Sequence, residues 1–116
     1  MPISTSERYH AAVVEIKGKF FGSRDGAEYQ ETIQRLLDSG KSQIVLDLSG
    51  TELMDSSGIG ALIESAQKVR AKGGDIRLAG VEKKMKNLFL MTRLLGEVFQ
   101  DYETVDEAAQ SFSQDA

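Results

Sequence analysis

Apolar residues occur in several runs of strand length along the chain. Residues 3–9 and 12–17 alternate between apolar and polar positions, as half-buried strands do, and His10 and Ala11 between them suit a hairpin turn. Residues 44–48 are almost continuously apolar, which is typical of a central strand covered on both faces. Two shorter runs, at 76–79 and 98–99, complete the predicted strands.

Between these strands, apolar residues recur every three or four positions, which predicts helices. A first helix is expected over residues 25–39, after a glycine-rich loop at 18–26, with a buried stripe made of Tyr29, Ile33, Leu36 and Leu37. A second is expected over residues 59–70, and a third is marked by Met85, Leu88 and Phe89. A capping box at 104–107 opens a fourth, which runs to Phe112, and residues 113–116 are expected to be frayed.

Strands that alternate with helices build right-handed βαβ units with parallel strands. The sequence therefore predicts an α/β fold: a mixed, mostly parallel sheet of four or five strands with about four helices packed against it. The opening hairpin contributes an antiparallel pair. Residues 1–116 are expected to form one domain, and the pattern leaves open which helix covers which face of the sheet.

The composition argues against several kinds of chemistry. The chain has no cysteine and one histidine, His10, which disfavours thiol catalysis, a transition-metal site and a Ser-His-Asp triad. A formal net charge of −4 disfavours binding of nucleic acid through phosphate contacts. No apolar stretch approaches the ~20 residues of a membrane span, and residues 1–10 lack the apolar centre of a signal peptide. We therefore expect a cytoplasmic, non-enzymatic protein without a cofactor.

The most informative stretch joins the strand at 44–48 to the helix at 59–70 and reads Asp55-Ser56-Ser57-Gly58-Ile59-Gly60. Free N–H groups and the helix dipole make a helix start favourable for an anion such as phosphate. The two serines also have an ordinary structural explanation, because serine commonly caps a helix N-terminus. Each glycine weakens a helical turn by roughly 0.5–1 kcal/mol relative to alanine, which suggests that something approaches the backbone closely.

Part of this stretch, Gly58-Ile59-Gly60, matches a dinucleotide-binding fingerprint, although Ile63 stands where a third glycine is required. A nucleotide-binding regulatory module is therefore one alternative function. Titration with ATP and GTP would test it.

Two further groups of residues are candidates for partner contacts. Phe20 and Phe21, in the glycine-rich loop, either form an exposed apolar surface for a partner or plug the end of the sheet. Lys83, Lys84 and Lys86 form either a solvated helix face or a contact for an acidic partner.

The stretch 55–60, preceded by Ile44-Val45-Leu46-Asp47-Leu48-Ser49-Gly50, resembles the signature of the STAS domain family, which includes bacterial anti-sigma factor antagonists. The resemblance extends from about residue 3 to residue 112. It implies a STAS-like fold and a regulator of transcription without catalytic activity. It also implies that Ser57 accepts phosphate from an anti-sigma factor serine kinase, which binds the ATP, and that a PPM-type phosphatase removes the phosphate. Asp55, Ser56, Gly58, Ile59 and Gly60 would form the phospho-loop that the partner contacts.

In this family the unphosphorylated antagonist binds the kinase and thereby frees the sigma factor. Typical members carry an aspartate shortly after the glycine that ends the second strand, whereas this chain reads Gly18-Lys19-Phe20-Phe21-Gly22. We expect phosphate on Ser57 to block the interface electrostatically, with little change of fold, because it adds about −1.5 to −2 charges. The resemblance leaves a second alternative, a STAS subunit of a lipid transporter that is not phosphorylated. For the oligomeric state we expect a monomer or a weak homodimer.

Overall fold

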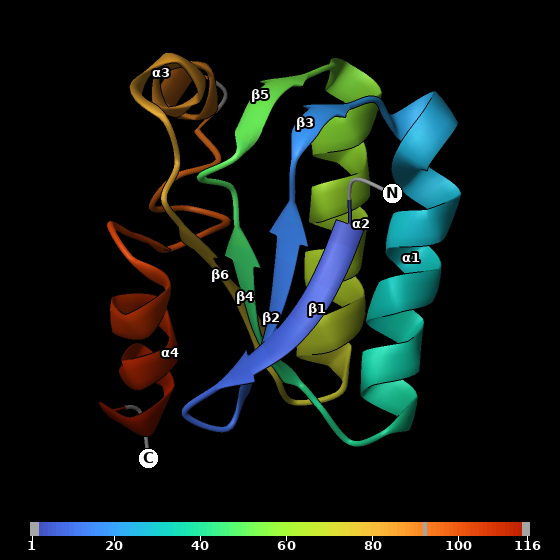
Figure 1. Cartoon of the computed structure of the whole chain (residues 1–116), viewed down its shortest axis with the longest axis vertical. Coiled ribbons are helices and arrows are strands. Elements are labelled where there is room, and N and C mark those ends of the chain that lie inside the picture. Colours follow the sequence, from blue (N-terminus) through green and yellow to red (C-terminus); the bar gives the residue numbers. More distant parts are fainter. Residues whose placement is uncertain (1–2, 92, 115–116) are drawn as a thin grey trace.

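The computed structural model describes residues 3–91 and 93–114. It begins with a hairpin, and one or two strands separate each of its helices from the next (Figure 1). The strands are β1 (Ile3–Arg8), β2 (Ala11–Ile16), β3 (Gly18–Phe20), β4 (Gln43–Asp47), β5 (Thr51–Met54), β6 (Asp75–Ala79) and β7 (Asp101–Tyr102). The helices are α1 (Gly22–Asp38), α2 (Ser56–Ala71), α3 (Lys83–Met91) and α4 (Val105–Gln114).

Five of the strands form one sheet in the order β1-β2-β4-β6-β7. The first pair is antiparallel, and the pairs β2–β4, β4–β6 and β6–β7 are parallel. The sheet therefore confirms the expected mixed, mostly parallel architecture. Strands β3 and β5 form a second, two-stranded parallel sheet that the apolar pattern did not predict, because both strands are short and carry exposed residues such as Lys19 and Glu52.

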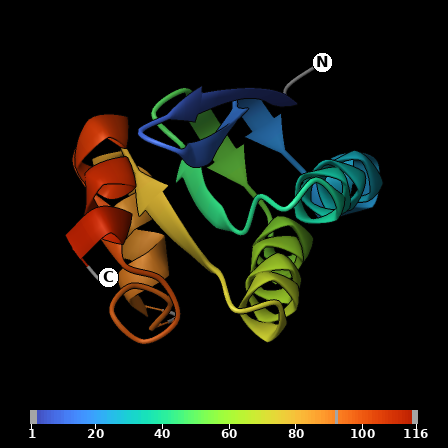
Figure 2. The same cartoon turned by 90° about the horizontal axis from the view of Figure 1, so that it is seen from below.

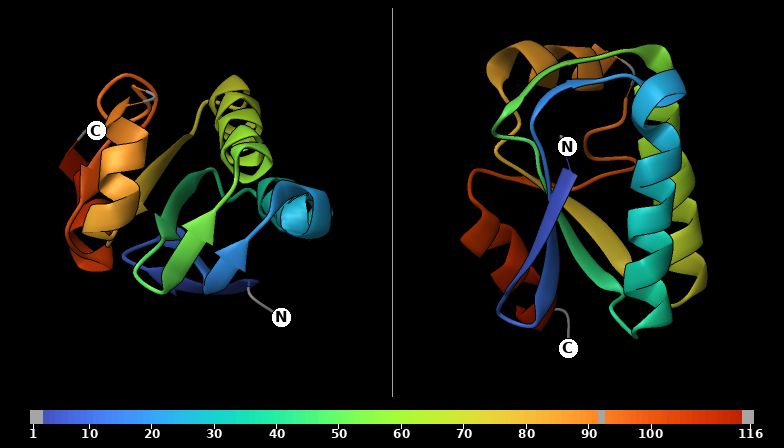
Figure 3. Two further views of the ribbon diagram at one scale, coloured as in Figure 1. Left: turned by 90° about the horizontal axis from the view of Figure 1, so that it is seen from above. Right: turned by 45° about the vertical axis from the view of Figure 1, so that its right-hand side comes forward.

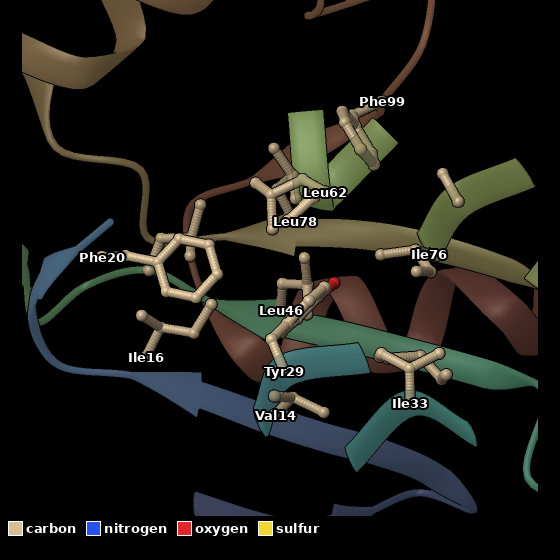
Figure 4. Close-up of a cluster of buried hydrophobic side chains, with 14 of the residues drawn as sticks. Val14, Ile16, Phe20, Tyr29, Ile33, Leu46, Leu62, Ile76, Leu78 and Phe99 are labelled. Carbon is tan, nitrogen blue, oxygen red and sulfur yellow. The ribbon is translucent and has the colours of Figure 1, made fainter. Parts of the chain in front are cut away.

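Helices cover both faces of the main sheet, as the view from below shows (Figure 2). The alternation along β2 explains the two layers: Val14 and Ile16 belong to the core beneath α1 and α2, whereas Val13 belongs to the core beneath α4. Figure 4 shows the larger core, in which side chains from the sheet meet Tyr29 and Ile33 of α1 and Leu62 of α2. The smaller core consists mainly of alanine, valine and Phe112.

The hairpin turn lies one residue earlier than expected, at Tyr9-His10, and Ala11 is already part of β2. Both turn residues have positive φ, 52° for Tyr9 and 70° for His10. Two-residue hairpin turns with this backbone match the twist of the strands and usually contain Asn-Gly or a similar pair. The absence of these residues in the turn explains why the sequence placed it wrongly.

Both helices at the functional end begin three residues earlier than expected. α1 begins at Gly22 instead of residue 25, and α2 begins at Ser56 instead of residue 59. In each case the first turn contains glycine, which is a poor helix former, so the sequence pattern predicts a loop there. In the structure, contacts with the other helix start stabilise these turns, as described below.

At the C-terminal end, the strand expected at 98–99 is an isolated bridge between Leu95 and Phe99, and the last strand of the sheet is β7. Residues 113 and 114, expected to be frayed, belong to α4, whereas 115 and 116 lie outside the described residues. The side chain of Leu88, expected in the stripe of the third helix, also lies outside them; Met85 and Phe89 of that stripe are buried.

Candidate functional site

The stretch 55–60 forms the first turn of α2, and Asp55 is its N-cap (φ −90°, ψ 177°). The Asp55 carboxylate oxygen Oδ1 accepts a hydrogen bond from the backbone N–H of Gly58 at 2.7 Å. Aspartate is among the preferred N-cap residues because its side chain satisfies one of the free N–H groups. The structural explanation that the sequence suggested, a serine cap, is therefore wrong, and neither Ser56 nor Ser57 has this role.

Ser57 is exposed in the first turn of α2. Its hydroxyl Oγ donates a hydrogen bond to Oδ1 of Asp55 at 3.0 Å. The same oxygen accepts the backbone N–H of Gly22 at 3.1 Å, from the first residue of α1. Asp55 thus joins the starts of two helices, which lie side by side at the top of the molecule in Figure 1 and in the right panel of Figure 3.

Gly22 lies directly against Ser57. A Cβ atom at Gly22 would lie 2.3 Å from the carbonyl carbon and oxygen of Ser57, and 2.7 Å from its Oγ. These distances are far shorter than van der Waals contact, so only glycine fits between the two helix starts. An aspartate therefore does not fit at Gly22 in this arrangement.

The two glycines of the motif differ in their surroundings. Gly58 is buried, and a Cβ there would lie 2.7 Å from the carbonyl oxygen of Phe20 and 2.8 Å from Cγ of Met54. Gly60 is exposed, and a Cβ there would meet no atom within 4 Å. The expected close backbone approach is thus confirmed at Gly58 and wrong at Gly60. Ile59, between them, is half-buried and packs against the larger core.

Phe20 is completely buried, and its ring packs edge-on against Tyr29 with the ring centroids 5.5 Å apart. The expectation that Phe20 belongs to an exposed partner surface is therefore wrong, and Phe20 instead plugs the end of the sheet. Phe21 is half-buried beneath the guanidinium of Arg24, 5.0 Å from the ring centre. Of the two aromatic residues, only Phe21 keeps exposed surface beside the helix start.

Charged groups connect the residues of the turn between β3 and α1. Arg24 donates hydrogen bonds to both carboxylate oxygens of Asp25 and to the carbonyl of Lys19, at 2.7 to 3.2 Å. Asp25 is only 6% exposed and accepts the backbone N–H of Phe21 at 3.0 Å. Sequence reasoning missed this Arg24–Asp25 pair, because its importance depends on the burial of Asp25.

Both carboxylates near Ser57 are held in the ionised form. The N–H groups of Gly58 and Gly22 lower the pKa of Asp55, with a smaller contribution from the Ser57 hydroxyl. Hydrogen bonding from Arg24 lowers the pKa of Asp25. Ser57 therefore stands beside a permanent negative charge at neutral pH.

Leu53 is an exposed apolar residue that sequence reasoning also missed. It lies on β5, two residues before Asp55, and 46% of its surface is exposed. A strand pattern over residues 51–54 would have been the only signal, and it is too short to recognise by alternation. Leu53 adds apolar surface to the same end of the molecule as Ser57.

The remaining candidate residues lie apart from Ser57. Lys83 and Lys84 line a groove of about 600 Å³ between the β4–β5 loop and the start of α3, and Lys86 pairs with Asp101 at 3.4 Å. His10 is exposed in the β1–β2 turn, at the opposite end of the sheet from the start of α2 (Figure 1). Within residues 3–91 and 93–114, no three side chains of the His, Asp or Glu type are arranged to hold a metal ion. No helix in that part of the chain is long and apolar enough to cross a bilayer.

Comparison with known structures identifies proteins of the same fold. An anti-sigma factor antagonist from Mycobacterium paratuberculosis is 19% identical with a TM-score of 0.80, covering 94% of this chain and 91% of that one. The Bacillus cell fate determinant SpoIIAA, solved in its phosphorylated form, is 20% identical with a TM-score of 0.72, covering 95% and 98%. The murine anion transporter solute carrier 26 family member A9 is 16% identical with a TM-score of 0.73, covering 96% of this chain but 19% of the transporter.

At such identities these matches establish a common fold. The family itself follows from the sequence model of the STAS domain, which matches residues 2–108. The match contains the whole of the helix start built around Asp55 and Ser57. The chain therefore belongs to the STAS domain family.

Proposed function

We propose that this protein is a bacterial anti-sigma factor antagonist that acts by partner switching in the cytoplasm. In its unphosphorylated form it binds an anti-sigma factor that is also a serine kinase, and it is released when that kinase phosphorylates Ser57. A PPM-type phosphatase restores the binding form. The observation that carries the proposal is the exposed Ser57 hydroxyl in the first turn of α2, held by Asp55 at 3.0 Å.

The position of Ser57 suits a phosphoacceptor that is modified without unfolding the domain. Its side chain is exposed, and the positive end of the helix dipole offsets part of the cost of a phosphate. In the reaction, Oγ forms a bond to the γ-phosphorus of ATP held by the kinase, the bond from that phosphorus to the bridging oxygen breaks so that ADP leaves, and the hydroxyl proton is released to water.

The same position explains why phosphate would end the interaction. The phosphate brings about −1.5 to −2 charges to a surface that already contains the ionised Asp55. Enclosing this charge in a protein interface costs on the order of several kcal/mol, whereas the helix dipole returns only ~1 kcal/mol. The phosphate therefore repels the partner through desolvation and charge while the domain keeps its fold.

The comparisons support the proposal at the level of fold and family. An antagonist from Mycobacterium paratuberculosis shares the fold, and the similar SpoIIAA of Bacillus has been solved as a phosphorylated protein. Phe21 and Leu53 supply exposed apolar surface near Ser57, which a partner protein can contact.

The test begins with affinity capture from the source organism, followed by incubation of the protein with the captured kinase and ATP. Tandem mass spectrometry should find one phosphate, on Ser57, with labelling abolished in Ser57→Ala and retained in Ser56→Ala. Phosphorylation should weaken the complex at least about 100-fold by calorimetry. Phosphate at another residue, or equal affinity of the phosphorylated and unphosphorylated proteins, would contradict the proposal.

The match to an anion transporter supports a second candidate, a STAS subunit of a membrane transporter, including the lipid-transporter type. In that case the affinity capture should recover a permease with its ATPase. Ser57→Asp should then be captured as efficiently as the wild type, because phosphorylation would have no role.

A further inference from the structure

We propose that, when Ser57 is phosphorylated, the backbone N–H of Gly22 donates its hydrogen bond to the phosphate instead of to Asp55. The turn between β3 and α1 then changes with the modification. This inference rests on the proposed phosphorylation of Ser57. It adds the β3–α1 turn to the surface that phosphorylation changes, beside the start of α2. The region concerned is the turn Phe20-Phe21-Gly22, which contacts the start of α2.

One oxygen atom, Oδ1 of Asp55, connects the two helix starts. It accepts three donors: the N–H of Gly58 at 2.7 Å, the hydroxyl of Ser57 at 3.0 Å and the N–H of Gly22 at 3.1 Å. A carboxylate oxygen has two lone pairs, so three donors must share them. The bond from Gly22 is the one that comes from another helix, so it can be exchanged without unwinding the first turn of α2.

Phosphorylation changes this arrangement in two ways. The esterified Oγ has no proton left to donate, so the bond from Ser57 to Asp55 is lost. A phosphate dianion then faces the Asp55 carboxylate, which remains ionised and is repelled. The N–H of Gly58 lies in the same helical turn as Asp55 and keeps its bond to this N-cap. The N–H of Gly22 belongs to another helix and can donate to the phosphate instead.

Gly22 is also close enough for the exchange. Its backbone lies against Ser57, since a Cβ at Gly22 would be 2.7 Å from Oγ, the atom that carries the phosphate. The N-cap of α1, Phe21, provides no side-chain hydrogen bond, so the Gly22 N–H depends on an acceptor from outside α1, which in the unphosphorylated protein is Asp55. Both acceptors are ionised, but the phosphate carries about −1.5 to −2 charges against the single charge of the Asp55 carboxylate, so it attracts the Gly22 N–H more strongly.

The test uses ¹⁵N-labelled protein in which phosphoserine is incorporated genetically at position 57, and NMR of the Gly22 amide over pH. Between about pH 5 and about pH 7.5 the Gly22 amide proton should move downfield as the phosphate loses its second proton, with a midpoint near 6. The matched control carries phosphoserine at position 56, which is exposed in the same turn, and its Gly22 signal should stay in place. The unphosphorylated protein controls for effects of pH that do not come from the phosphate.

A Gly22 signal that does not follow the phosphate, or that follows it equally in the two phosphoserine proteins, would overturn the inference. So would loss of the dispersed spectrum in the protein with phosphoserine 57, because the exchange requires an intact fold. The experiment needs no kinase, so failure of the kinase assay would leave this result standing. Conversely, a Gly22 amide signal that does not respond would not contradict the proposal that Ser57 is phosphorylated.

Discussion

At the scale of single residues, Gly22 and Gly26 lie one helical turn apart in α1 but have opposite surroundings. A Cβ at Gly22 would collide with the backbone of Ser57 at 2.3 Å, whereas a Cβ at Gly26 would meet no atom within 4 Å. Gly22 is therefore required by the contact between the helix starts. Gly26 only lowers the propensity of its segment to form a helix.

We predict that Gly22→Ala lowers the free energy of unfolding by about 1–3 kcal/mol, because the two helix starts must separate. The matched control, Gly26→Ala, should raise it by about 0.5–1 kcal/mol. Urea denaturation followed by circular dichroism measures both changes. Equal effects of the two substitutions would show that Gly22 is not confined by Ser57.

At the scale of elements, a buried hydrogen bond joins α1 and α2 below their starts. The hydroxyl of Tyr29 lies 2.7 Å from Oγ of Ser65, and Ser65 donates its own proton to the carbonyl of Leu62 at 2.7 Å. Tyr29 is therefore the donor of the pair. Its burial raises its pKa, so the hydroxyl remains protonated and able to donate.

We predict that Ser65→Ala costs about 1–3 kcal/mol, because the Tyr29 hydroxyl is left buried without an acceptor. Adding Tyr29→Phe should recover part of this loss, so that the double variant costs less than the sum of the single variants by about 1 kcal/mol. A double-mutant cycle in urea measures this coupling energy. Strictly additive costs would mean that packing alone holds the two helices together.

At the scale of the whole molecule, carboxylates with lowered pKa values make the folded state sensitive to acid. Asp55 is held ionised by the N–H groups of Gly58 and Gly22, and Asp25 by Arg24. Because an unfolded chain binds protons at these groups at higher pH than the folded one, their stabilisation is complete above the unfolded pKa of about 3.9 and is lost as the pH falls below it.

We therefore predict that the urea midpoint falls progressively from about pH 5 to about pH 2. Asp55→Asn should be less stable than the wild type at neutral pH and should lose less stability on acidification, because Asn keeps an oxygen acceptor for Gly58 but has no charge to lose. Urea titrations of both proteins across this range give the comparison. Parallel curves would mean that Asp55 makes no contribution to acid sensitivity.

Much of the architecture could be predicted from the spacing of apolar residues along the chain. The apolar run 44–48 gave the central strand β4, and the apolar stripes located all four helices. The pattern failed for β3 and β5, where the strands are too short to show alternation, and at the first turns of α1 and α2, where glycine lowers helix propensity. It also misplaced the Tyr9-His10 turn, which lacks the usual turn residues.

For the candidate site, the sequence supplied the motif and the prediction that Ser57 is its functional residue. It assigned the capping role to a serine, although Asp55 has it, and it left open whether Phe20 and Phe21 were surface or core. The spacing of residues along one segment does not reveal these roles. They depend on contacts between segments, such as the hydrogen bond that the N–H of Gly22 donates to Asp55, 33 residues away in the chain.

The sequence by itself thus determined most of the strands, the approximate positions of the helices and the motif at the start of α2, because periodicity and helix-start chemistry are local properties. Only the tertiary structure decided that α4 covers one face of the sheet and α1 and α2 the other, that Phe20 is buried, and that two helix starts meet at Asp55. The physical reason is that these features arise from contacts between distant segments, whose geometry depends on how the whole chain packs.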